Sequence, residues 1–269
     1  EGVEIDGNPV GLITYMRTDS VRISDDAQGM AQEFILQNYG EKYYPEKPNI
    51  YVKGKQNVQD AHEAIRPSYP ERTPESIKQY LDNDQYKLYK LIWEKFMSSQ
   101  MAPAEIANKT IEIQSGDYML RAGTSKVMFD GFLTLYNDAE DDEDKATDAK
   151  IPDLEKGDKV VCKKITPKQH FTQPPPRYNE ASLVKALEEY GIGRPSTYAT
   201  IITVIQTRKY VEKKDKALHP TLLGRTVSKQ LVSQFSDIMD YKFTAGMEEK
   251  LDKIAEKQAI WVKVLQDFY

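Results

Sequence analysis

The chain has 269 residues, of which 39% are hydrophobic and 29% are charged, and this length allows two or three domains with apolar cores and a well-solvated surface. It holds no apolar run near the roughly 20 residues that cross a bilayer and no signal-peptide pattern. Its single cysteine, Cys162, excludes an internal disulfide and a Cys-x-x-Cys zinc site. We therefore expect a cytoplasmic protein. The chain begins at Glu1 rather than Met, which favours a piece of a longer protein.

The net charge of −5 is unevenly distributed along the chain. An acidic tract at 138–145 holds six Asp or Glu and one Lys, whereas residues 163–229 hold thirteen Lys or Arg against five Asp or Glu. Charge blocks of this kind indicate partners and solvation rather than fold. The basic block predicts either a DNA-binding surface or a well-solvated helical surface.

Residues 1–101 are predicted to form a mostly helical domain. The sequence Asp6-Gly7-Asn8-Pro9 is typical of a hairpin turn, and the apolar run after it, at 10–17, favours an extended segment. Helices are expected at 25–39, from about 60 to 67, at 75–81 and at 85–97. The apolar stripe of the last helix consists of Leu88, Leu91, Ile92 and Phe96.

Residues 102–172 have a different hydrophobic pattern, which predicts a β-rich segment. Alternating or β-compatible runs occur at 110–114, 118–122, 127–136 and 159–165. The acidic tract between them, at 137–150, is expected to be a mobile loop. Consecutive prolines at 174–176 then favour an extended linker.

Residues 173–269 are predicted to form a second helical domain. A helix is expected at 180–190, with Gly191 just after its end, and Ser196 is a good N-cap for the next helix. A Lys-rich hairpin follows, and this order predicts a winged helix-turn-helix. Three further helical stretches complete an α+β multidomain fold: a helical domain at 1–101, a β-rich segment at 102–172 and a helical winged-helix-like domain at 173–269.

The first candidate site is the pair Tyr15 and Arg17. In an extended segment these two side chains project from the same side of the strand. A phenol has a pKa of about 10, and a nearby guanidinium favours the phenolate and grips a phosphate through two parallel hydrogen bonds. The pair therefore suits attack on a phosphodiester through a phosphotyrosyl intermediate. The alternative is that Tyr15 is one of many packing or surface residues among seventeen tyrosines.

The second candidate site is the segment that holds His62 and Arg66. Asp60 and Glu63 have the spacing of a capping box, which would place His62 and Arg66 on one face of a short helix. A phosphate would suit such a cationic pair. The alternative leaves Glu63 as a helix cap and His62 as a neutral surface residue. One histidine without a second ligand at i+4 is a poor metal site, and we expect no metal ligands in the chain.

The third candidate site is the turn that holds Arg194, Ser196 and Thr197. Arg194 precedes a helix N-terminus, whose free N–H groups favour an anion, and two hydroxyl groups follow it. This arrangement suits a DNA phosphate. The alternative is a simple helix-turn-helix corner in which Ser196 caps the helix and Arg194 points to water.

Several segments carry a resemblance to a known family. Smaller matches lie at 171–175 and 243–248, and the three main motifs are Ile13-Thr14-Tyr15-Met16-Arg17-Thr18-Asp19-Ser20, Ala61-His62-Glu63-Ala64-Ile65-Arg66-Pro67 and Gly191-Ile192-Gly193-Arg194-Pro195-Ser196-Thr197-Tyr198. In this order and spacing they resemble type IA DNA topoisomerases, in the form of the bacterial topoisomerase I branch. The resemblance covers essentially the whole chain.

The resemblance implies roles for the candidate residues. Tyr15 would be the nucleophile that becomes linked to a 5′ phosphate of single-stranded DNA. Arg17 would hold and neutralise that phosphate, and His62 would lie near it. Arg194 would contact the bound strand, with Thr197 assisting. The family relaxes negatively supercoiled DNA without ATP, by opening one strand, passing another through and resealing. Its fold is toroidal, and residues 102–172 would form part of its β arch.

The resemblance also implies partners outside these residues. The family's Toprim domain binds Mg²⁺ through acidic residues, and no such segment precedes Tyr15 in this sequence. We therefore expect Mg²⁺ and the Toprim domain to be partners of this chain. We also expect a monomer that binds single-stranded DNA but has little or no relaxation activity alone.

Two other functions compete with the enzyme fragment. One is a regulator that reads duplex DNA with the winged helix-turn-helix, which would not need Tyr15 and Arg17. The other is a scaffold whose acidic tract recruits a basic partner.

Overall fold

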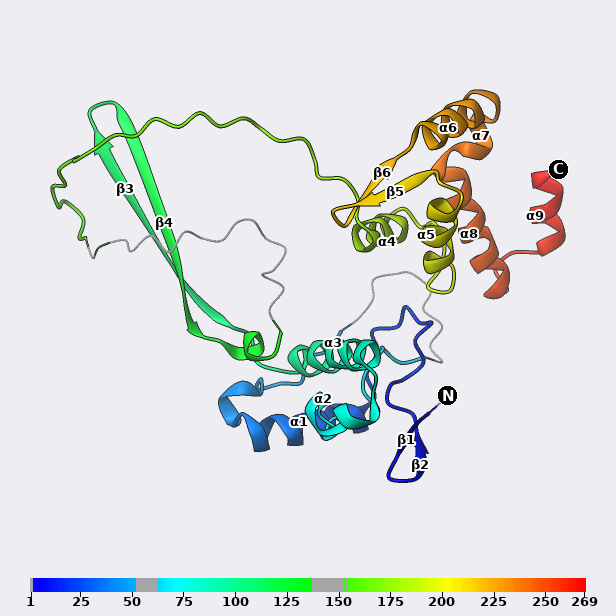
Figure 1. Cartoon of the computed structure of the whole chain (residues 1–269), viewed down its shortest axis with the longest axis horizontal. Helices are drawn as coiled ribbons and strands as arrows, with labels where there is room; N and C mark the ends of the chain where they lie inside the picture. The colour runs from blue at the N-terminus through cyan, green and yellow to red at the C-terminus, as the bar shows by residue number, and fades with distance from the viewer. Residues whose placement is uncertain (1, 52–61, 137–151, 153) are drawn as a thin grey trace. The chain divides into compact units, whose positions relative to one another are not determined.

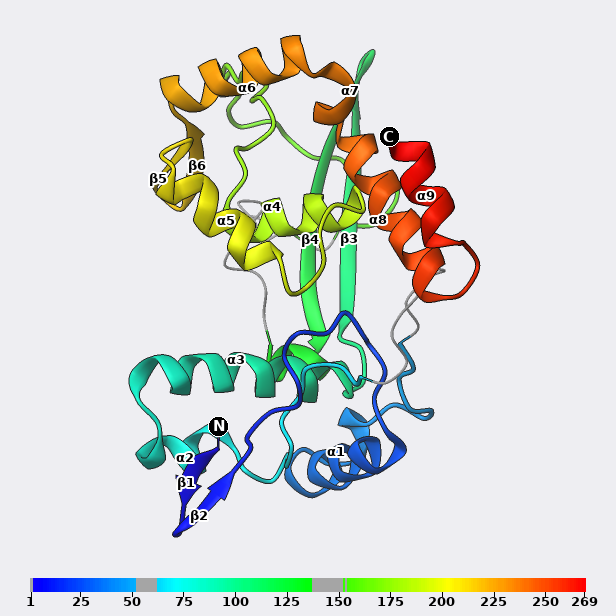
Figure 2. The same ribbon diagram turned by 90° about the vertical axis from the view of Figure 1, so that its right-hand side faces the viewer.

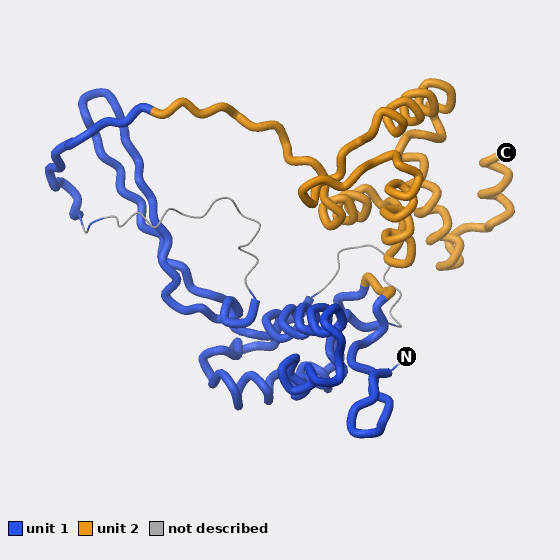
Figure 3. The backbone as a smooth tube through the Cα atoms, viewed as in Figure 1, with its two compact units in different colours: residues 1–16, 20–54, 59–167 blue, residues 17–19, 55–58, 168–269 orange. Residues whose placement is uncertain are grey.

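The computed structural model describes residues 2–51, 62–136, 152 and 154–269. They divide into two compact units (Figure 3): residues 2–16, 20–51, 62–136, 152 and 154–167 form the first, and residues 17–19 and 168–269 form the second. Both units combine helices with two-stranded antiparallel sheets, which confirms the α+β class. The finer division at 101 and 172 stays a prediction. Every helix among the described residues is too short or too polar to cross a membrane.

The first unit opens with the predicted hairpin. Strands β1 (Val3–Ile5) and β2 (Asn8–Val10) pair antiparallel around Asp6 and Gly7, whose φ angles are 52° and 77°. Two positive φ angles are typical of the tight turn that matches strand twist. Of the extended segment predicted over 10–17, Val10 ends β2 and Ile13 forms a bridge with the distant Pro67, whereas the chain bends at 16 and 17.

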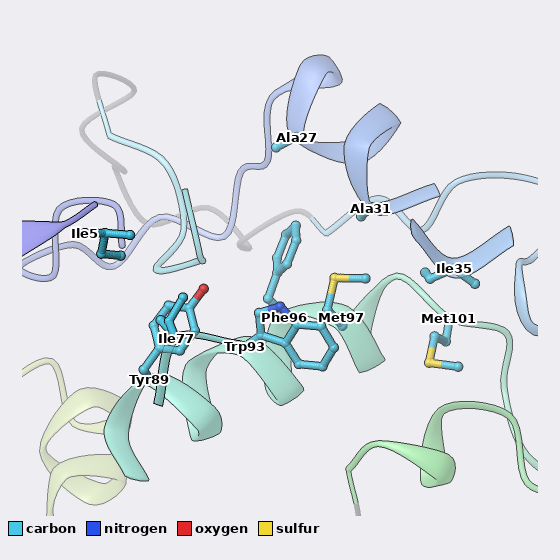
Figure 4. Packing of buried hydrophobic residues seen from close by; sticks show 10 residues of the cluster. All are labelled: Ile5, Ala27, Ala31, Ile35, Ile77, Tyr89, Trp93, Phe96, Met97 and Met101. Atoms are coloured by element: carbon cyan, nitrogen blue, oxygen red, sulfur yellow. The ribbon is translucent and has the colours of Figure 1, made fainter. Parts of the chain in front are cut away.

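The core of the first unit lies between two helices (Figure 4). They are α1 (Asp25–Asn38), whose first turn carries acidic residues that suit a helix N-terminus, and α3 (Asn83–Ser99), which starts with an Asp82–Gln85 capping box. Between them in the chain lie α2 (Pro74–Ile77) and the 3₁₀ turns η1 (Glu41–Tyr43) and η2 (Lys78–Tyr80). The buried core comprises Ile5, Ala27, Ala31, Ile35, Ile77, Tyr89, Trp93, Phe96, Met97 and Met101.

The predicted apolar face of α3 is partly wrong. Leu88 and Leu91 are 56% and 52% exposed, whereas Tyr89 and Trp93 are 4% exposed. Both aromatic residues reach a backbone carbonyl: the Tyr89 hydroxyl donates to Arg72 at 2.7 Å and the Trp93 indole donates to Pro70 at 2.9 Å. A buried Tyr or Trp needs such a partner for its polar tip. The helix is therefore turned toward its aromatic residues.

The β-rich segment is a single long ribbon in the described residues (Figure 1). Strands β3 (Glu105–Ser115) and β4 (Tyr118–Phe129) pair antiparallel along their length. The strand predicted at 127–136 ends at Phe129, and the 3₁₀ turn η3 (Gly131–Thr134) replaces its second half. Gly131 has a φ of 49°, and a Cβ there would lie 2.6 Å from the Ala102 carbonyl oxygen. This close approach requires glycine and ends the strand.

Two other predictions for this segment have different outcomes. Residues 159–165 run without strand pairing in the described part of the chain, so the strand predicted there is wrong. The acidic tract predicted as a loop at 137–150 lies outside the described residues.

The second unit has the predicted order of helix, turn, helix and hairpin. These elements are α4 (Glu180–Glu189), α5 (Tyr198–Thr207), β5 (Val211–Lys214) and β6 (Ala217–Pro220). Its assignment as a winged helix stays a prediction. The remaining helices are α6 (Leu222–Gln234), α7 (Ser236–Met239), α8 (Tyr241–Ala255) and α9 (Trp261–Phe268), of which α8 and α9 lie side by side (Figure 2).

Candidate active site

Two strand-like segments far apart in the sequence build the site around Tyr15. The N–H of Thr14 donates to the Arg66 carbonyl at 3.0 Å, and the N–H of Ser68 donates to the Leu12 carbonyl at 2.9 Å. Between these bonds, Ile13 forms an antiparallel bridge with Pro67. The chain on either side of this bridge therefore carries Tyr15 on one segment and His62 near the other.

The side chain of Thr14 reinforces this pairing. Its hydroxyl donates to the Ala64 carbonyl at 2.7 Å and accepts from the N–H of Arg66 at 3.0 Å. The N–H of Ala64 in turn donates to the Arg22 carbonyl at 2.8 Å. A single hydroxyl at the residue just before Tyr15 thus bonds both the Ala64 carbonyl and the Arg66 N–H of the distant segment.

Tyr15 lies against His62. Their ring centroids are 4.9 Å apart with an interplanar angle of 40°, and Tyr15 is 51% exposed. His62 is half-buried. The phenol is thus accessible to a large substrate, and an imidazole beside it offers hydrogen-bond donors to a bound anion. The structure brings these two predicted site residues together.

Arg17 follows Tyr15 by two residues and is exposed. The backbone bends at Met16 and Arg17, so the expected strand geometry does not apply to the pair. The period-of-two argument therefore loses its premise here, and the placement of the two side chains on one side stays a prediction; both are exposed to solvent.

Arg66 has a different environment from the one predicted. The described residues from His62 to Arg66 are irregular rather than helical, and Asp60 lies outside the described residues. The Arg66 side chain is 11% exposed and is held by Glu63, with N–O distances of 2.8 and 2.7 Å. It also donates to the Pro67 carbonyl at 3.0 Å. Two guanidinium nitrogens thus share one oxygen of the Glu63 carboxylate, and this charge-assisted contact supports the segment that carries His62.

The third predicted site lies at the start of α5. Thr197, not Ser196, is the N-cap residue, and its hydroxyl accepts from the N–H of Arg194 at 2.9 Å instead of capping the helix. The predicted cap at Ser196 is therefore wrong, and Ser196 is exposed. Gly191, with a φ of 69°, follows the end of α4 as predicted.

Arg194 binds two carboxylates that the sequence reasoning missed. Its Nη2 lies 2.6 Å from Asp252 and 3.5 Å from Glu248, both on α8, while its Nη1 donates to the Gly193 carbonyl at 2.7 Å. Residues 243–248 belong to a motif of the resembled family, and the four-residue spacing of the two acids on a helix is the signal that could have paired them with a cation.

The described residues contain no group of three or more His, Cys, Asp or Glu side chains that could hold a metal ion. What the pair of Tyr15 and His62 offers chemically is a phenol and an imidazole.

Comparisons with known proteins agree with this geometry. A family model described as DNA topoisomerase matches residues 8–266. The structure is similar to that of full-length topoisomerase I from Thermotoga maritima, with a TM-score of 0.80 and 35% sequence identity; the match covers 100% of this chain and 43% of that one. The chain therefore spans less than half the length of this relative. On the family match and this likeness together, the chain belongs to the bacterial type IA DNA topoisomerases.

Proposed function

We propose that this chain carries the nucleophile of a topoisomerase that cleaves one DNA strand through Tyr15. The observation that supports this most is the exposed Tyr15 ring beside His62, at 4.9 Å, on a segment fixed by the Thr14 hydroxyl. An exposed phenol next to cationic or hydrogen-bonding groups suits attack on a phosphodiester.

In the proposed step the Tyr15 oxygen attacks the phosphorus of a single strand. The bond from phosphorus to the 3′ oxygen breaks, and a phosphotyrosyl bond to the 5′ phosphate forms. The phenol loses its proton and the departing 3′ oxygen gains one, so the step is balanced. Arg17 and His62 hold the phosphate oxygens through charge-assisted hydrogen bonds. Attack by the 3′ hydroxyl reverses the step and reseals the strand.

The complete cycle is proposed to need more than this chain. We propose that a Toprim domain supplies Mg²⁺, which stabilises charge on the phosphate when it is bound, and that strand passage then relaxes negatively supercoiled DNA without ATP. By itself the chain is proposed to be a cytoplasmic monomer that binds single-stranded DNA and has little relaxation activity. Arg66, which is occupied by Glu63, then acts by supporting His62.

The test is covalent trapping. The chain is mixed with labelled single-stranded DNA, alone and together with a separately made Toprim fragment plus Mg²⁺, and is then denatured. We expect a covalent adduct only in the complete mixture, with no adduct for Tyr15→Phe because the attacking oxygen is missing.

Tyr69→Phe is the matched control, since Tyr69 is similarly exposed at 45%. It should leave the adduct unchanged. An adduct that survives Tyr15→Phe would assign the nucleophile to another residue. Absence of any adduct in the complete mixture, with duplex bound in preference to single strands, would favour the regulator instead.

A further inference from the structure

One face of α8 packs against the turn between α4 and α5. The rings of Tyr190 and Tyr241 lie with centroids 5.0 Å apart, and a Cβ built on Gly191 would lie 3.8 Å from that of Ala245. Glu248 and Asp252, whose carboxylates bind Arg194, follow Ala245 by one and two turns on the same face of the helix. The turn that holds the predicted phosphate-binding residues is therefore docked on α8.

The charges at the end of this face do not balance. Arg194 contributes one positive charge, and Asp252 and Glu248 contribute two negative charges, with Asp252 at 2.6 Å and Glu248 at 3.5 Å. The three side chains are 36%, 43% and 27% exposed. A DNA phosphate that approaches the guanidinium thus meets a net negative group, and a phosphate that binds Nη2 competes with the carboxylates there.

Such an exchange is energetically accessible. Partly exposed ion pairs contribute little to stability, whereas a phosphate can accept two parallel bonds from one guanidinium. The carboxylates therefore hold Arg194 weakly enough for DNA to replace them, yet they occupy the Nη2 atom when DNA is absent.

We propose that Asp252 and Glu248 are positioning residues that hold Arg194 against α8 and compete with a backbone phosphate of single-stranded DNA for its guanidinium. This inference rests on the proposed function, because it takes DNA as the ligand of Arg194. It adds an exchange of partners at the α4–α5 turn: a carboxylate pair in the free chain and a phosphate in the DNA complex.

The test measures the affinity of the chain for a fluorescent single-stranded oligonucleotide at fixed low salt. Asp252→Asn keeps the shape of the side chain and removes the competing charge, so we expect binding about threefold tighter than for the unmodified chain. The matched control is Glu249→Gln, which removes the same charge from the same helix but from a residue paired with Lys253 at 2.7 Å. It should change the affinity by much less.

A double-mutant cycle assigns the effect to Arg194. In an Arg194→Ala background, Asp252→Asn should no longer tighten binding. If the Asp252→Asn chain shows less helical circular dichroism than the unmodified chain, Glu248→Gln is measured in its place.

Equal effects of Asp252→Asn and Glu249→Gln, weaker binding by Asp252→Asn, or an effect that persists without Arg194 would each overturn the inference while leaving DNA binding intact. A chain that binds no single strand in any form would overturn both the inference and the proposed function.

Discussion

At the scale of single residues, Thr14 is the side chain on which the position of Tyr15 depends. Its hydroxyl joins Ala64 and Arg66, fifty and fifty-two residues away in sequence, directly before the proposed nucleophile. Sequence reasoning found Tyr15 and His62 as separate candidates. The residue patterns alone could not bring them together, because their contact depends on a pairing between distant segments which leaves no periodic signal, and only the family resemblance placed His62 near the phosphate of Tyr15.

Replacing Thr14 by Val keeps the shape of the side chain and removes both hydrogen bonds. We expect the yield of the Tyr15–DNA adduct to fall about tenfold, equivalent to about 1.4 kcal/mol, while affinity for single-stranded DNA stays unchanged, because Tyr15 is then held less firmly toward the phosphate. Thr14→Ser, which keeps the hydroxyl, should restore the yield. A Thr14→Val chain that forms adduct at the normal rate would show that the hydroxyl has no positioning role.

At the scale of elements, the helices were predictable where capping and breaking residues mark their ends. The segment predicted at 25–39 is α1, and the one predicted at 180–190 is α4. The orientation of α3 was not predictable, because apolar residues occupy more than one of its faces. Its aromatic residues determine the buried face, since each finds a carbonyl partner across the core. Likewise, the prediction of a capping box at 60–63 gave Glu63 the role of a helix cap, so its ion pair with Arg66 was not predicted.

The buried face of α3 predicts unequal effects of two substitutions that lie two residues apart on different faces of the helix. Trp93→Ala should lower the free energy of unfolding by about 3–5 kcal/mol, because it removes a buried ring and leaves a cavity. Leu91→Ala, at a side chain 52% exposed, should change it by less than about 1 kcal/mol. Urea denaturation followed by circular dichroism measures both. Similar losses for the two variants would contradict the orientation of α3.

At the scale of the whole molecule, the two units differ in how much they bury. All but one of the buried hydrophobic residues in the described part of the chain lie in the first unit, and the exception is Leu218 in the second. The stretch at 158–178, which contains the boundary between the units at 167 and 168, is exposed and without regular structure. Composition predicted its prolines as a linker, but it could not show that the irregular stretch begins well before them.

Limited trypsin digestion should therefore cut first at the lysines of this stretch, Lys159, Lys163, Lys164 and Lys168. Exposed backbone without secondary structure is the preferred site of proteolytic cleavage. Mass spectrometry of early fragments measures the cut sites. Substitution of these four lysines by Gln should delay cleavage there, and early cuts within α1 or α3 instead would contradict the described burial.

The ribbon of β3 and β4 has a consequence for solubility. In the described part of the chain each strand pairs only with the other, so each leaves one edge of backbone N–H and C=O groups available to another molecule, a geometry that favours strand-to-strand aggregation. Charged residues punctuate both strands, among them Lys109, Glu112, Arg121 and Lys126. Charged side chains on an exposed edge disfavour pairing with a further strand, because their charges would have to leave water, and this opposes edge-to-edge association of ribbons.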